Sequence, residues 1–115
     1  MNNYSNFSSS LNEIGTQNEK RKESYTTDIE RICKYNQIQF IDIDSTVISE
    51  YCFDQYFTTD NVIKLIRVVL YYLDNEKYKT NDIGIRKHIN SKIDNIITYL
   101  ESLYKYNNAT KFNKN

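Results

Sequence analysis

The fold of this chain depends most on one stretch, Val62-Ile63-Lys64-Leu65-Ile66-Arg67-Val68-Val69-Leu70-Tyr71-Tyr72-Leu73. Arranged as a helix, the stretch is apolar around most of its circumference. A helix of this kind must be covered from more than one side, so it predicts the centre of a core or of an interface. Thr59 or Asp60 is expected to cap its N-terminus, and residues 74–77 are expected to form a polar turn after it.

The segments before this helix carry three further signals. Thr27-Asp28-Ile29-Glu30 is a capping box, which predicts the start of the first helix of the domain. Residues 38–44 alternate apolar and polar side chains at one end and favour a short strand, although its partner is not evident. Asp44 or Ser45 then predicts the cap of a helix that continues through Phe57.

The segments after it predict two short helices. Thr80 or Asn81 is expected to cap a helix across Ile83, Ile85 and Ile89, and Ser91 with Asp94 to open the last helix. The sequence therefore predicts a mainly α protein, a compact bundle of four to five helices. The sequence is also compatible with one short pair of β-strands beside the helices.

The chain of 115 residues has room for one domain only. Residues 1–24 hold few apolar side chains among Asn, Ser and charged residues, which predicts a disordered N-terminal tail. The single helical domain is expected over residues 25–106. The polar residues 107–115 are expected to form a flexible tail.

The apolar residues of segment 83–104 have the spacing by which two short helices pack at a steep angle. In this respect the segment resembles the helix-turn-helix of small, winged-helix-like transcriptional regulators. The charge distribution is compatible with it: residues 79–115 hold seven Lys and Arg against three Asp and Glu, whereas residues 1–78 hold eight against twelve. Acidic residues Asp94 and Glu101 flank the expected reading face, and Arg86 takes the place of the usual small residue.

The resemblance implies that the last helix contacts double-stranded DNA and that the protein is a homodimer. The expected DNA contacts are Arg86, Lys87, His88, Lys92, Asn95, Tyr99 and Ser102. The expected dimer interface is the central helix, through Val62, Leu65, Ile66, Val69 and Leu73.

A second motif, Phe40-Ile41-Asp42-Ile43-Asp44-Ser45-Thr46-Val47-Ile48, resembles the first motif of haloacid-dehalogenase-type phosphatases, phosphoserine phosphatase above all. The resemblance implies Asp42 as nucleophile, Asp44 as general acid/base and a magnesium ion. That fold needs several βα units of ~30 or more residues each, which the helical remainder of the chain does not supply. We therefore expect a structural role for both carboxylates, with no catalytic residue and no cofactor.

Cys33 and Cys52 lie nineteen residues apart without a CxxC pair, so no metal site and no disulfide framework is indicated. The longest apolar run, residues 68–73, is too short to span a bilayer, and the N-terminus has no stretch of signal-peptide type. An intracellular protein, cytoplasmic or nuclear and without a membrane partner, is expected.

Two functions follow as hypotheses. The first is a small DNA-binding regulator of transcription, borne by a plasmid or a virus. The alternative is a helical protein–protein interaction module, for example a viral or phage protein that occupies a host protein without nucleic acid or catalysis.

Overall fold

The computed structural model describes residues 19–113, and they form helices without any β-strand. The mainly α bundle expected from the sequence is confirmed. The elements, in chain order, are α2 (Glu19–Asn36), a short 3-10 helix η2 (Phe40–Asp42), α3 (Ser45–Asp54), α4 (Thr59–Lys79) and α5 (Ile83–Asn113).

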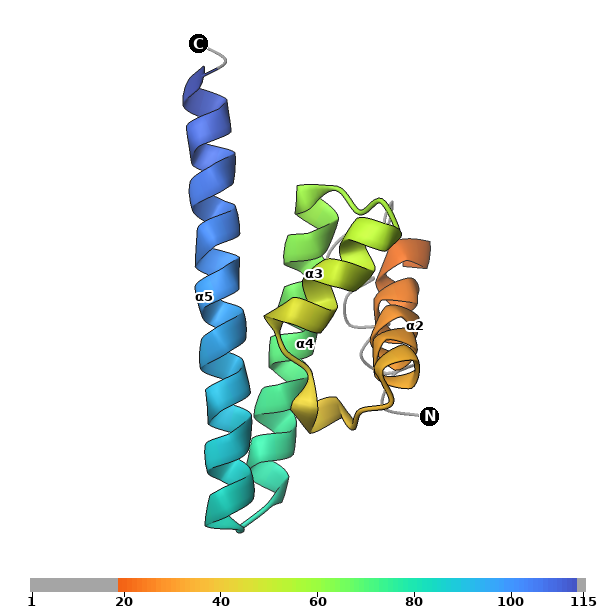
Figure 1. Ribbon diagram of the computed structural model, residues 1–115, viewed down its shortest axis with the longest axis vertical. Coiled ribbons are helices and arrows are strands. Elements are labelled where there is room, and N and C mark those ends of the chain that lie inside the picture. The colour runs from red at the N-terminus through yellow and green to blue at the C-terminus, as the bar shows by residue number, and fades with distance from the viewer. Residues whose placement is uncertain (1–18, 114–115) are drawn as a thin grey trace.

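The two longest helices, α4 and α5, lie antiparallel to each other, and the other elements pack against this pair (Figure 1). Thr58 caps α4 by accepting a hydrogen bond from the Asn61 N–H at 3.2 Å. Asp82 starts α5 by accepting one from the Ile85 N–H at 3.0 Å. Arg86 stabilises the turn between the two helices, because its Nε donates hydrogen bonds to the carbonyls of Lys77 and Thr80 at 3.2 and 2.9 Å.

The core lies where α2, α3 and the inner faces of α4 and α5 meet. Leu65, Ile66, Val69 and Leu73 of α4 are completely buried, as the apolar pattern of that helix predicted. Around them pack Tyr25, Ile29, Ile32, Ile43, Ile48, Tyr51, Cys52, Val62, Val68, Ile89 and Ile96.

The helix α5 is longer than the helix that it packs against. Its C-terminal part projects beyond α3 and α4 (Figure 1), and the molecule measures 50 Å along its longest axis. Residues 107–113, which were expected to belong to a flexible tail, continue α5, and this helix ends at Asn113. The sequence contains no proline that would interrupt the helix.

The predicted strand at 38–44 is also wrong. The N–H groups of Asp42 and Ile43 bond back to the carbonyls of Gln39 and Phe40, at 3.0 and 3.1 Å, and close a tight turn. The segment then has no need of a second strand, and Ile43 enters the core completely buried.

Other predicted boundaries shift as well. The first helix begins at Glu19 and contains the Thr27 capping box in its interior, where Tyr25, Thr26 and Asp28 are buried by packing. The expected turn at 74–77 is helical, because α4 continues to Lys79. Of the predicted N-terminal tail, residues 1–18 lie outside the described residues.

Candidate functional site

The predicted helix-turn-helix is absent from segment 83–104, because α5 runs through it as one uninterrupted helix. The physical reason is the register of its apolar residues. Ile89, Ile93, Ile96, Leu100 and Leu103 follow one another at alternating steps of four and three. A single straight helix can therefore lay all five against α4, and nothing requires a turn at Ser91, which is exposed.

Three of the seven predicted DNA contacts are bonded to a residue outside α5. The amide oxygen of Asn95 accepts the Ser45 N–H at 2.8 Å and so caps the first turn of α3. The imidazole Nε2 of His88 lies 2.7 Å from Oδ1 of Asp42. Arg86 holds the last carbonyls of α4, as described above.

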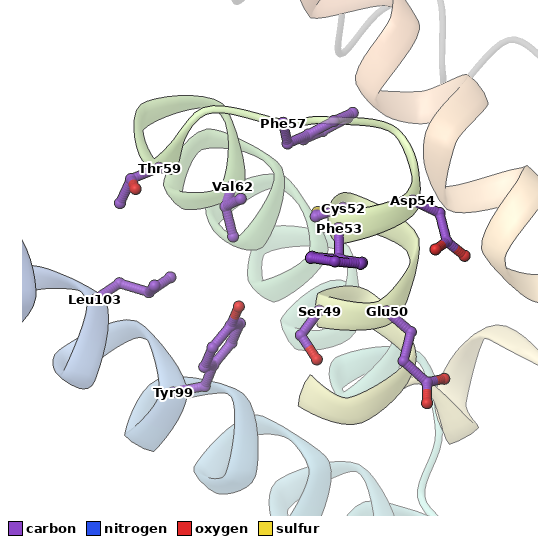
Figure 2. A pocket seen from close by; sticks show the side chains of 10 residues that line it. All are labelled: Ser49, Glu50, Cys52, Phe53, Asp54, Phe57, Thr59, Val62, Tyr99 and Leu103. Carbon is purple, nitrogen blue, oxygen red and sulfur yellow. The ribbon is translucent and has the colours of Figure 1, made fainter.

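The other four predicted DNA contacts differ from one another in exposure and in their partners. Lys87 is exposed and Lys92 is half-buried. The Ser102 hydroxyl donates to the Tyr99 carbonyl of its own helix at 2.6 Å. Tyr99 is half-buried and its ring is turned towards α3 and α4 (Figure 2). The seven residues therefore do not form one outward-facing surface.

The predicted dimer interface is wrong for the same kind of reason. Val62, Leu65, Ile66, Val69 and Leu73 are all buried within the single chain, the last four completely. Leu65, Ile66, Val69 and Leu73 form the core against α2, α3 and α5, so these four present no surface to a second copy.

The two carboxylates of the phosphatase-like motif each have a structural partner. Asp44 is the N-cap of α3, because its Oδ1 accepts the Val47 N–H at 3.1 Å. Asp42 belongs to η2 and pairs with His88. The buried strand that precedes these residues in the phosphatase motif is replaced here by the 3-10 turn.

A groove of about 710 Å³ lies between α3 and α5. Figure 2 shows side chains from both helices and from the start of α4 around it. Its lining residues are Ser49, Glu50, Cys52, Phe53, Asp54, Phe57, Thr59, Val62, Tyr99 and Leu103. Cys52 and Val62 are buried at its base, which gives the groove an apolar floor.

An exposed aromatic ring stands at this groove. Phe53 is 83% exposed although it is one of the lining residues. Its exposure follows from the end of α3, where the chain reverses through Tyr56 with φ of 57° and the Phe57 N–H bonds to the Cys52 carbonyl at 2.9 Å. This left-handed turn usually takes glycine at its positive-φ position. It turns Phe57 inward and leaves Phe53 on the last turn of α3, outside the core.

The charge of the groove has one sign. Among the described residues that line it, Glu50 and Asp54 are the charged ones, and both are acidic. The hydroxyl of Tyr99 can donate a hydrogen bond into the groove, and burial raises its pKa above the ordinary value. The groove therefore combines an apolar floor, a hydroxyl donor and a negative wall.

Sequence reasoning missed this groove. The available signal was the cluster Phe53, Tyr56 and Phe57, three aromatic residues in five positions around the end of a predicted helix. The sequence predicts a role for Tyr99, but as a contact to DNA. It lies on the face of α5 that was expected to read DNA and that the fold turns towards α3.

The remaining features are sparse. Cys52 is a buried thiol and Cys33 a half-buried one, whose pKa is raised by its burial and by the nearby carboxylate of Asp42. Residues 19–113 hold no group of three His, Cys, Asp or Glu side chains that could bind a metal ion. Within the same range, no helix combines the length and apolar character that crossing a membrane requires.

No family model, curated protein or solved structure matches this chain. Its class is therefore defined by its own architecture. The protein is a small all-α bundle in which α2 and α3 pack on one side of a long antiparallel helix pair.

Proposed function

We propose that this protein is a helical interaction module that holds a helical segment of a partner protein in the groove between α3 and α5. The observation that carries the proposal is Phe53, an aromatic side chain that is 83% exposed beside an apolar floor. Covering a side chain of this size releases about 1.5–3 kcal/mol. Buried aromatic anchors of this kind dominate the binding energy of protein interfaces.

The shape of the groove favours a helix as its occupant. Two helices, α3 and α5, form opposite walls, and an amphipathic helix can place its apolar face between them. Figure 2 shows Phe53, Tyr99 and Leu103 around the space that such a face would occupy.

The charge of the groove defines the chemistry of the partner. Glu50 and Asp54 offer two carboxylates, and no lysine or arginine of the described chain lines the groove. A partner segment with Lys or Arg beside its Leu or Phe residues is therefore favoured over an acidic one.

DNA binding is the rival proposal. The excess of seven Lys and Arg over three Asp and Glu in residues 79–115 supports it. The groove itself opposes it, since carboxylates repel phosphate. Asn95, His88 and Arg86 would also have to break contacts within the chain before they could reach a base or a phosphate.

The test uses a synthetic amphipathic helical peptide with Leu and Phe on one face and Lys at its flanks, and a twin with Glu in place of Lys. We expect the lysine peptide to bind the full chain and to shift the amide NMR signals of α3 and α5. Phe53→Ser should weaken this binding by about tenfold or more. Tyr56→Ser is the matched control, because Tyr56 is 93% exposed three residues away and is not among the lining residues.

A second variant tests the contribution of the two carboxylates to peptide binding. Glu50→Gln together with Asp54→Asn should reduce the preference for lysine over glutamate peptides and the salt dependence of binding. The proposal fails if neither peptide binds or if Phe53→Ser and Tyr56→Ser behave alike. Binding to a mixed-sequence duplex that falls steeply with rising salt would favour the DNA rival.

A further inference from the structure

A second groove lies on the outer face of the α4–α5 pair. It has a volume of about 370 Å³ and is lined by Arg67, Leu70, Tyr71, Asp74, Ile93 and Ile97. All six residues belong to α4 or α5. Because neither α2, η2 nor α3 contributes to its lining, these elements of the described chain leave this face uncovered.

The face is apolar at its centre. Tyr71 is 51% exposed and Ile97 is 38% exposed, with Leu70 and Ile93 half-buried beside them. Four apolar side chains from two helices therefore lie together at the surface of one groove, and clustering of this kind favours an interaction site over scattered exposure. This apolar face also explains why α4 is apolar around so much of its circumference, since one side fills the core and another side lies here.

The charged residues of this face stand in a specific order along α4. Arg67 and Asp74 are separated by seven residues, which places them on one stripe with Leu70 and Tyr71 between them. From the N-terminal to the C-terminal end of this stripe, Arg67 is positive, Leu70 and Tyr71 are apolar, and Asp74 is negative. A second α4 helix that runs in the opposite direction presents the same residues in reverse order.

This order is complementary to itself. In a two-fold interface the same patch of both subunits meets, so the patch must match its own copy. When two α4 helices lie antiparallel with their central Leu70 and Tyr71 in contact, Arg67 faces the partner's Asp74. The same contact occurs a second time, by symmetry, at the other end.

We propose that two copies of this chain associate through this face, with α4 antiparallel to α4, so that the two helix pairs form a four-helix arrangement. Local contacts hold both charged side chains at the surface. The Arg67 guanidinium donates to the Tyr104 hydroxyl, and Asp74 pairs with Lys77 at 3.3 Å. Exposed pairs of this kind are weak, so they can yield to contacts across the interface.

This dimer interface lies on a different face from the peptide groove, so the two proposals can fail independently. Sedimentation of the full chain over a range of concentrations should show a monomer–dimer equilibrium. Arg67→Glu alone and Asp74→Arg alone each place like charges at both ends of the interface. Each should raise the dissociation constant by about tenfold or more.

The decisive experiment mixes these two variants. In a mixed dimer, the glutamate introduced at position 67 of one subunit meets the arginine introduced at position 74 of the other. At the opposite end, the unchanged Asp74 of the first subunit meets the unchanged Arg67 of the second, so both contacts are again opposite in charge. We expect dimers to return only in the mixture.

The apolar centre has a variant of its own. Tyr71→Ser should weaken the dimer, because it removes a large ring from the contact. Tyr35→Ser, which removes a 78% exposed tyrosine on α2, should not. Phe53→Ser, which acts on the peptide groove, should also leave the dimer unaffected.

Circular dichroism of every variant confirms that the helices are retained, since all of the changed side chains are at the surface. The proposal is overturned if the parent chain is monomeric at all concentrations. It is equally overturned if the single charge variants dimerise as the parent does, or if their mixture stays monomeric.

Discussion

The imidazole Nε2 of His88 and the carboxylate Oδ1 of Asp42 lie 2.7 Å apart, and this contact joins α5 to η2 across 46 residues of sequence. Both side chains are partly exposed, so the contact is worth about 0.5–1.5 kcal/mol. We expect His88→Ala and Asp42→Ala each to lower the free energy of unfolding by this amount, measured in urea.

The double variant checks that the two residues act together. It should cost little more than either single change, because both remove the same contact. Lys87→Ala, next to His88 but exposed, should leave stability unchanged. Strictly additive losses would show that the pair is not coupled.

Asn95 is expected to act on stability, because its side chain caps the neighbouring helix α3 through the Ser45 N–H. Asn95→Ala should lower the unfolding free energy by about 1 kcal/mol. Asn95→Asp keeps an acceptor and adds a negative charge at the N-terminus of α3, so it should retain the stability of the parent. Ser102→Ala, whose hydroxyl bonds within α5, is the control. Equal melting temperatures for Asn95→Ala, Asn95→Asp and Ser102→Ala would show that Asn95 does not stabilise the start of α3.

The buried hydroxyl of Tyr51 predicts a dependence of stability on alkaline pH. It donates to Asp28 at 2.5 Å, and burial together with this bond raises the pKa of Tyr51 from 10.0 to about 12. Between these two values the unfolded chain has lost the Tyr51 proton and the folded chain still holds it. Stability therefore falls as pH rises from about 10 to about 12, by up to about 2 kcal/mol.

Tyr51→Phe isolates this effect from the titration of the other tyrosines and the lysines. Below pH 10 the variant should be less stable than the parent by about 1–2 kcal/mol, because the hydrogen bond is lost. The difference should shrink as pH rises above 10, measured by urea unfolding at each pH. A difference that stays constant over this range would contradict the assigned cause.

Ile66 tests the position of the core. Its side chain is completely buried, so Ile66→Asp would bury a charge without a partner and should prevent folding. Lys64→Asp, two residues earlier on the same helix but exposed, should fold with little change in melting temperature. Cooperative melting of Ile66→Asp near the parent temperature would place the core elsewhere.

Substitutions at Asp44 distinguish a role as helix cap from a role in phosphatase chemistry. Asp44→Ala should cost about 1 kcal/mol, and Asp44→Ser, which also accepts a hydrogen bond from the first turn, should recover most of it. We expect no magnesium-dependent hydrolysis of phosphomonoesters by the parent chain. Turnover that disappears in Asp42→Asn would support the phosphatase resemblance instead.

The apolar pattern of α4 and the cap at Asp44 are the parts of this fold that local sequence describes well. A cap involves residues three positions apart, and a buried face repeats with each helical turn, so both signals lie within one short window. The helix at 83–104 was predicted as two, because Ser91 followed by Asp94 has the composition of a helix start. A continuous apolar register against α4 overrode that local preference.

The order of the amino acids was enough to show that the chain is helical, that α4 is central and that residues 79–115 carry an excess of positive charge. Which polar residues can meet a partner depended instead on how the helices pack. Asn95 and His88 are polar and look like binding residues in the sequence, yet their side chains contact Ser45 and Asp42, 50 and 46 residues away along the chain. Phe53 and Tyr71, which look like core residues in the sequence, are 83% and 51% exposed in the fold. Burial depends on which surfaces meet, and a pattern within one helix carries no information about the length or the position of its neighbours.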